Sequence, residues 1–180
     1  MTIKIPLLAG ACCLAAALAP LPASAATVPA CSAGKPTAAS YTWDFKAEAA
    51  RTFSDIRADV EQIATNTDEL RALTRDDEVS YNPGESYYWN QVDSAINDMG
   101  NRECRLQTIR RVVSPAQQRA IDKILAENRL MAYHARNAGD FGKAHPENLL
   151  MGPYRDDLVN LYNEAQALAG VMKTVSRASA

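Results

Sequence analysis

Val113-Ser114-Pro115-Ala116-Gln117 is the stretch that decides the fold, because it ends one long amphipathic segment and starts another. Ser114 and Gln117 have the spacing of a capping box, in which two side chains satisfy backbone N–H groups at a helix start. Pro115 suits the first helical position, where no N–H group is needed. We expect a tight turn here, so the helices on either side are antiparallel neighbours.

Apolar residues recur at steps of three and four on both sides of this turn, which is typical of helices with one buried face. The preceding helix is predicted at about 85–113. The following helix is predicted at about 115–138, with Gly139 as its C-cap glycine. Each apolar stripe has one polar interruption, Arg102 in the first helix and Asn128 in the second.

Two further segments show the same periodicity. Asp44 is an N-cap candidate for a helix at about 44–74, and Pro153 stands at the start of another at about 153–176. No alternating strand pattern competes with these helices. The connections are too short for parallel crossovers, so we predict an all-α protein in which residues 43–177 form one antiparallel up-down-up-down four-helix bundle.

Residues 1–25 have the pattern of a cleavable signal peptide. Lys4 precedes an apolar stretch from Leu7 to Ala19, and the small residues Ala23-Ser24-Ala25 form a cleavage site. The apolar stretch is shorter than the ~20 residues that cross a bilayer as a helix, so the mature protein is expected to have no transmembrane helix. We predict export to the periplasm or outside the cell; a lipoprotein anchored at Cys12 is the alternative.

Residues 26–42 are rich in Ala, Thr, Pro, Ser and Gly, a composition that buries too little apolar surface to fold. We predict that they form a flexible tether. The full chain has 19 basic and 21 acidic residues, with a net charge of -2. This balance does not favour a nucleic-acid partner.

Cys31 and Cys104 are the two cysteines that remain after signal cleavage. Cys104 lies two residues before Leu106, so at about 100° per residue it faces away from the apolar stripe of its helix. Two thiols in an oxidising compartment usually pair. We therefore predict an intramolecular disulfide between Cys31 and Cys104; an intermolecular disulfide and a free thiol are the alternatives.

One end of the predicted bundle collects both long loops and most aromatic residues, and we call it the loop-rich pole. Aromatic and histidine side chains on loops over a rigid scaffold favour binding. Packing of the aromatic rings between the helix ends is the alternative interpretation. Tyr81 and Tyr87 share this pole. The candidate binding residues are Tyr88, Trp89, Tyr133, His134, Phe141, His145 and Tyr154.

No motif indicates catalysis, a metal or a cofactor. The sequence has two histidines, His134 and His145. Asp140 and Glu147 are the carboxylates that would join them in a metal site, but the spacing matches no ligand signature. No Cys-x-x-Cys-His sequence is present, which excludes covalent haem. The acidic pair Asp156-Asp157 is interpreted as solvated surface, and we expect a non-enzymatic protein without a cofactor.

Arg102 and Asn128 lie at similar heights above their shared turn, on stripes that are otherwise apolar. We interpret them as one polar layer that sets the register between helices. A polar site inside a small cavity is the alternative. The predicted partners in this layer are Glu127, Asn163 and Glu164.

The stretch 113–117 resembles the Leu-Thr-x-x-Gln motif of small periplasmic stress and metal-resistance chaperones of the Spy and CpxP type. That family normally shows two copies, and the second candidate here, residues 73–77, ends in Asp77 where glutamine belongs. The resemblance implies a cradle-shaped dimer whose exposed apolar surface holds unfolded clients. The four apolar stripes instead favour a closed core.

These patterns together predict an exported bundle that binds a protein or envelope partner, or a small ligand, at the loop-rich pole. A chaperone-like stress protein is the second hypothesis. A bundle that carries a metal or haem is the third.

Overall fold

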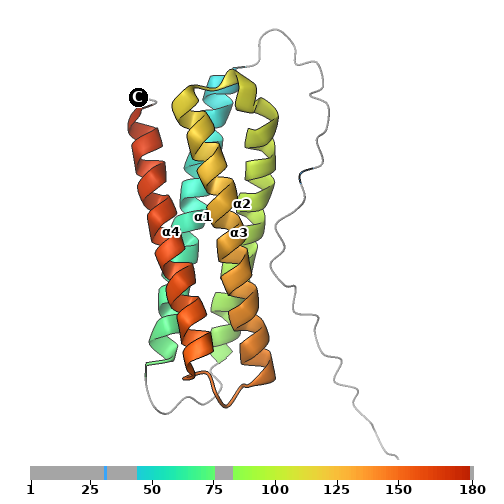
Figure 1. Ribbon diagram of the computed structural model, residues 1–180, viewed down its shortest axis with the longest axis vertical. Helices are drawn as coiled ribbons and strands as arrows, with labels where there is room; N and C mark the ends of the chain where they lie inside the picture. Colours follow the sequence, from blue (N-terminus) through green and yellow to red (C-terminus); the bar gives the residue numbers. More distant parts are fainter. Residues whose placement is uncertain (1–30, 32–43, 76–82, 179–180) are drawn as a thin grey trace, which may run out of the picture.

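The structure is a computed structural model that describes residues 31, 44–75 and 83–178. Its described residues form four long helices around one core (Figure 1). The predicted signal peptide and, except for Cys31, the predicted tether lie outside the described residues. The helices are α1 (Phe45–Leu73), α2 (Pro83–Ile109), α3 (Pro115–Ala144) and α4 (Gly152–Ala178), and a short 3-10 helix, η1 (Arg110–Val112), follows α2.

Each helix of the bundle packs against two others. α1 lies against α2 and α4, while α3 lies against α4 and α2, so the four helices form a square in cross-section. We call each interface between two neighbouring helices a seam, and the α2–α3 seam has the least contact of the four. The turn at Ser114 lies at one end of the bundle and the 145–151 connection lies at the other (Figure 1). We call the first end the turn pole and keep the name loop-rich pole for the second.

Two helix starts form as the sequence predicts. Ser114 Oγ accepts a hydrogen bond from the Gln117 N–H at 3.3 Å, and Gln117 Oε1 accepts one from the Ser114 N–H at 3.0 Å. At the start of α1, Asp44 Oδ1 accepts from the N–H groups of Lys46 and Ala47, each at 3.0 Å. The capping box and the N-cap are therefore confirmed, and both rest on short-range hydrogen bonds.

The predicted end of the third helix at Gly139 is wrong. α3 continues to Ala144, and no described glycine has a positive φ angle. Phe141 packs partly against the core, and a Cβ atom at Gly142 would lie 3.3 Å from the Tyr154 ring. The last turns of α3 are thus used for packing at the loop-rich pole, and this tertiary contact outweighs a glycine stop signal worth about 1 kcal/mol.

The apolar stripes of all four helices meet in one core, which confirms the all-α bundle. α2 ends at Ile109, four residues before its predicted end at Val113, and the chain continues as the 3-10 helix η1. None of the described helices is long and apolar enough to cross a bilayer. The fully buried large side chains of the core are Ile56, Ile63, Leu70, Ile96, Met99, Leu106, Ile121, Ile124, Met131, Tyr154, Leu158 and Leu161.

Candidate functional site

Tyr154 is the centre of the loop-rich pole. Its side chain is fully buried, its hydroxyl donates to Glu85 Oε1 at 2.7 Å, and the same hydroxyl accepts from Trp89 Nε1 at 3.2 Å. The Trp89 and Tyr154 rings meet edge to face with centroids 6.3 Å apart, a favoured geometry for aromatic pairs. Burial and the neighbouring Glu85 raise the pKa of Tyr154, so the phenol stays protonated and remains a donor.

α3 closes the same cluster from the other side. The Phe141 ring centroid lies 6.5 Å from that of Tyr154 and 4.8 Å from that of His145. Leu149 is 4% exposed and packs beside Gly142. A Cβ atom added at position 142 would lie 3.4 Å from the Leu149 side chain. We call Trp89, Phe141, Leu149 and Tyr154 the aromatic plug; it holds the ends of α2, α3 and α4 together.

Other predicted binding residues are not part of the aromatic plug. Tyr133 is 57% exposed on α3, and His145 is exposed at the end of that helix. Tyr88 is half-buried against the core, and its ring contacts that of Tyr87, which is 60% exposed. The structure therefore brings Trp89, Phe141, His145 and Tyr154 together and leaves the tyrosines at 87 and 133 outside.

His134 belongs to a polar cluster on the α3–α4 seam. Its Nδ1 lies 2.6 Å from Asp157 Oδ1, and its Nε2 lies 3.4 Å from Glu164 Oε1. All three side chains are less than one-fifth exposed. Burial raises the pKa of Glu164, while His134 lowers it and nearby Glu127 raises it further. The cluster joins two helices through the imidazole.

His134, His145, Asp140 and Glu147, whose spacing matches no metal-ligand signature, do not form one cluster in the structure. Asp140 is exposed and faces Lys143, and His145 packs against Phe141 instead. The interpretation of Asp157 as solvated surface was wrong, since its carboxylate pairs with His134. The missed signal was the seven-residue spacing of Asp157 and Glu164, which places both carboxylates on one face of α4.

Among residues 31, 44–75 and 83–178, no group of three or more His, Cys, Asp or Glu side chains is placed to hold a metal ion. Instead, Asp157 is hydrogen-bonded to His134 Nδ1 and Glu164 lies 3.4 Å from Nε2, an arrangement that orients the imidazole.

The single polar layer predicted for Arg102 and Asn128 was also wrong. Arg102 forms an ion pair with Asp59 of α1, and burial raises the pKa of Asp59 to about 6 although Arg102 opposes this. Asn128 instead faces Glu103, the next residue of α2. Successive helical residues point about 100° apart, so positions 102 and 103 meet different neighbouring helices.

Glu103 and Asn128 form a buried polar pair on the α2–α3 seam. Glu103 is 1% exposed and Asn128 is fully buried. None of their side-chain polar atoms has a hydrogen bond of ordinary geometry to a described residue. Burial raises the pKa of Glu103, while the nearby Asn128 amide and Arg129 charge lower it. Such a pair weakens a seam more than an apolar pair of equal size would.

Asp93, on α2, is expected to make the stability of the protein depend on pH. Burial, opposed by Lys143, raises the pKa of Asp93 from 3.8 to about 6. The folded state binds the Asp93 proton more tightly than the unfolded chain does. Protonation of Asp93 therefore stabilises the fold fully below about pH 4, and this stabilisation is lost as the pH rises through 6. We expect Asp93→Asn to become more stable than the wild type by at most about 3 kcal/mol at pH 7.

Urea unfolding at pH 4 and at pH 7 measures this difference. The difference in unfolding free energy between Asp93→Asn and the wild type should be small at pH 4 and larger at pH 7. A matched control is Asp98→Asn, which removes an exposed carboxylate one turn further along α2. A gap that is equal at the two pH values would contradict the assignment.

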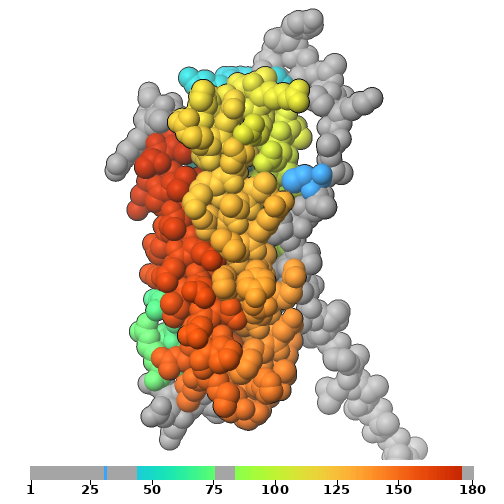
Figure 2. Space-filling model, viewed as in Figure 1, coloured from blue at the N-terminus to red at the C-terminus, as the bar shows by residue number. Residues whose placement is uncertain are grey.

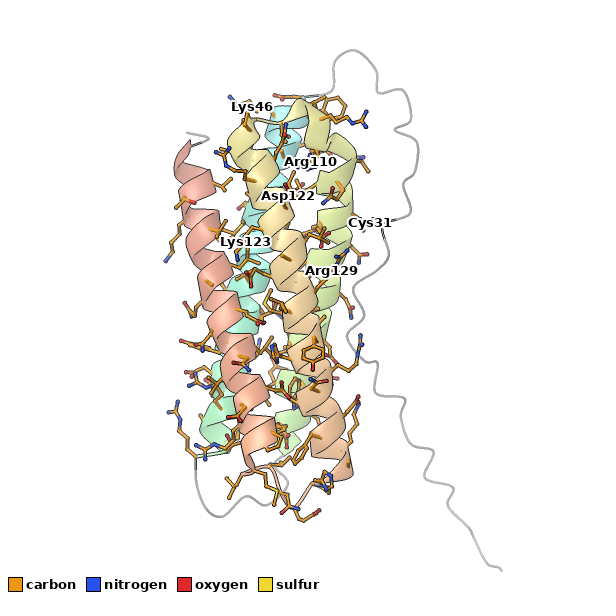
Figure 3. The ribbon with its side chains drawn as sticks, viewed as in Figure 1. Cys31, Lys46, Arg110, Asp122, Lys123 and Arg129 are labelled. Carbon is orange, nitrogen blue, oxygen red and sulfur yellow. A yellow bond between two sulfur atoms is a disulfide. The ribbon has the colours of Figure 1, made fainter. Side chains whose placement is uncertain are left out.

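The predicted cysteine pair is present. The Sγ atoms of Cys31 and Cys104 are 2.14 Å apart, at disulfide distance, and the two Cα atoms are 5.1 Å apart. Cys31 is exposed on the outer side of α2, as Figures 2 and 3 show. The outward orientation of Cys104 that was inferred from its spacing to Leu106 agrees with this bond.

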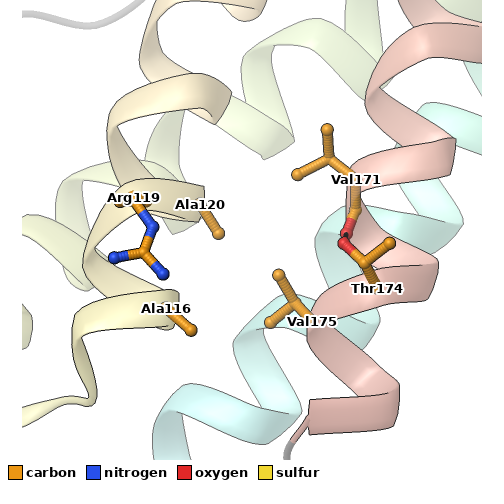
Figure 4. A pocket seen from close by; sticks show the side chains of 6 residues that line it. All are labelled: Ala116, Arg119, Ala120, Val171, Thr174 and Val175. Carbon is orange, nitrogen blue, oxygen red and sulfur yellow. Dashed lines mark hydrogen bonds between the residues drawn. The ribbon is translucent and has the colours of Figure 1, made fainter.

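A hollow lies between α3 and α4 at the turn pole (Figure 4). Its volume is about 330 Å³, which is at the small end of ligand-binding cavities. The walls are mostly apolar, and among the described residues that line the hollow Arg119 is the charged one. The lining residues are Ala116, Arg119, Ala120, Val171, Thr174 and Val175.

Comparison with known proteins adds no assignment: no protein-family model, curated protein or solved structure matches this chain.

Proposed function

We propose that the protein is an exported, non-enzymatic binding protein that uses its loop-rich pole to bind a protein or envelope partner, or a small ligand. In this proposal the mature protein is an up-down-up-down bundle that follows a cleaved signal peptide. The observation that carries it is the aromatic plug, together with the exposed rings of Tyr87 and Tyr133 on two of the helices that the plug joins. Aromatic side chains on a rigid support lose little conformational entropy on binding.

The packing of the apolar stripes supports a local binding surface over a chaperone cradle. All four stripes are used in one core, whereas a holdase needs a large continuous apolar surface for its clients. The exposed large apolar side chains of the described residues are spread over several elements. They are Tyr87, Val112, Leu130, Tyr133, Met151 and Val159.

The contacts of His134 support a non-enzymatic role. Both ring nitrogens face carboxylates of α4, and in the described residues no serine, threonine or cysteine side chain is hydrogen-bonded to them. An imidazole with two carboxylate partners has no free nitrogen to activate a nucleophile. Its geometry suits a structural cross-link between helices.

Mutation of the two exposed tyrosines tests this proposal, because the variant should lose the bound partner. Cells that make the protein are treated with a cross-linker, and the unreduced protein from the envelope fraction is analysed by native mass spectrometry. We expect added mass on the wild type that is absent from the Tyr87→Ala/Tyr133→Ala variant. Because both side chains are exposed, its unfolding free energy should stay within about 1 kcal/mol of the wild type.

Val112→Ala is the matched control. Val112 is 61% exposed, as much as Tyr87, but it lies at the turn pole. This variant should keep the added mass. A wild type that is always bare, or equal added mass on the double tyrosine variant, would refute binding at the loop-rich pole.

A further inference from the structure

The described charges are unevenly divided between the two poles. The half of the bundle with the turn pole, residues 44–58, 100–130 and 165–175, has eleven basic and six acidic side chains. The half with the loop-rich pole, residues 59–75, 84–99 and 131–164, has five basic and twelve acidic ones. The fold therefore turns a nearly neutral sequence into a molecule with a basic pole and an acidic pole.

Part of the basic charge at the turn pole is not neutralised. Arg105 pairs with Glu48, and Arg110 pairs with Asp122 at 2.7 Å. Other cations of this pole are exposed and form no ion pair with any described residue. They come from α1, η1, α3 and α4, and Figure 3 labels Lys46 at this pole. They are Lys46, Arg111, Arg119 and Lys173.

Apolar surface lies among these cations. Val112 is 61% exposed in the turn between α2 and α3, next to Arg111. The hollow between α3 and α4 opens nearby, with apolar walls and Arg119 beside it (Figure 4). Cations that flank an exposed apolar side chain are the combination that holds proteins at an anionic membrane surface.

We propose that the turn pole docks on the surface of an anionic lipid bilayer. The unpaired cations bind the phosphate headgroups, and Val112 enters the headgroup boundary. The acidic half is repelled by the same surface, so the loop-rich pole points into the water. This proposal does not depend on partner binding at the loop-rich pole, since it rests on other residues.

Vesicle sedimentation with the disulfide-bonded protein tests the docking. We expect binding to vesicles of phosphatidylcholine with about one-third phosphatidylglycerol, and little binding to pure phosphatidylcholine. Raising the salt from about 0.05 M to about 0.5 M should release the protein, because charges are then screened over a few ångströms.

Charge-neutralised variants locate the surface. Each cation near an anionic bilayer contributes about fivefold to the partition coefficient, so Arg111→Gln/Arg119→Gln should bind about 25-fold more weakly. The control Arg75→Gln/Arg155→Gln also removes two exposed cations, but from the acidic half, and should bind like the wild type. Val112→Ser keeps the charge and should weaken binding about three- to tenfold. Unchanged melting temperatures show that the variants are folded.

Three outcomes would overturn the proposal. The first is no binding to the anionic vesicles at low salt. The second is an equal loss in the two double variants, because net charge alone would then control binding. The third is binding to heparin or duplex DNA without binding to vesicles, which would assign the basic pole to a soluble polyanion.

Discussion

Replacing Tyr154 with alanine is expected to lower the free energy of unfolding by about 3 to 5 kcal/mol, the usual cost of removing a large buried ring. Tyr154 is fully buried and contacts both Trp89 and Phe141, so its removal empties the middle of the aromatic plug. α2, α3 and α4 would all lose a common partner at the loop-rich pole. Urea unfolding followed by circular dichroism measures the loss.

Tyr154→Phe separates the hydroxyl from the ring. It keeps the packing but leaves the partly buried Trp89 N–H and the Glu85 carboxylate without their partner, which should cost about 1 to 2 kcal/mol. Tyr87→Ala is the control at the same pole, because that ring is 60% exposed and should matter little to stability. If Tyr154→Ala were as stable as Tyr87→Ala, the plug would not hold this pole together.

Removing the disulfide is expected to have a similar effect. Cys31 and Cys104 are 73 positions apart, so the bond restricts a long loop of the unfolded chain. The chain-entropy model gives about 4 kcal/mol for a loop of this length. The Cys31→Ser/Cys104→Ser variant should therefore unfold at a clearly lower urea concentration than the oxidised wild type.

The wild type in the presence of a reductant is the matched control. It has the native sequence without the bond, so its unfolding free energy should equal that of the double serine variant. Non-reducing electrophoresis should show a compact monomer for the oxidised wild type. Equal stability of the oxidised and reduced proteins, or a dimer band, would contradict an intramolecular stabilising bond.

The two poles of the bundle have different properties, and the predictions above separate them. The loop-rich pole is held by the aromatic plug and has exposed tyrosines around it. The turn pole has unpaired cations around Val112. Variants of Tyr87 and Tyr133 therefore test partner binding, while variants of Arg111 and Arg119 test lipid binding, and each set serves as a control for the other.

The sequence alone determined where the helices lie and how two of them start. Asp44 and the Ser114–Gln117 capping box act through hydrogen bonds to residues two or three positions away, so their spacing is visible in one dimension. The apolar stripes were equally visible, because burial of one helix face follows the 3.6-residue period. The outward position of Cys104 followed from the same geometry.

Only the tertiary structure decided which side chains meet. Arg102 pairs with Asp59, and Glu103 faces Asn128, because adjacent residues of α2 point to different helices. The end of α3 likewise depended on packing against Tyr154, a residue on another helix. The separation of charge between the poles also required the fold, since segments far apart in sequence must first lie side by side. Periodicity describes one helix, whereas partners depend on how helices are rotated against each other.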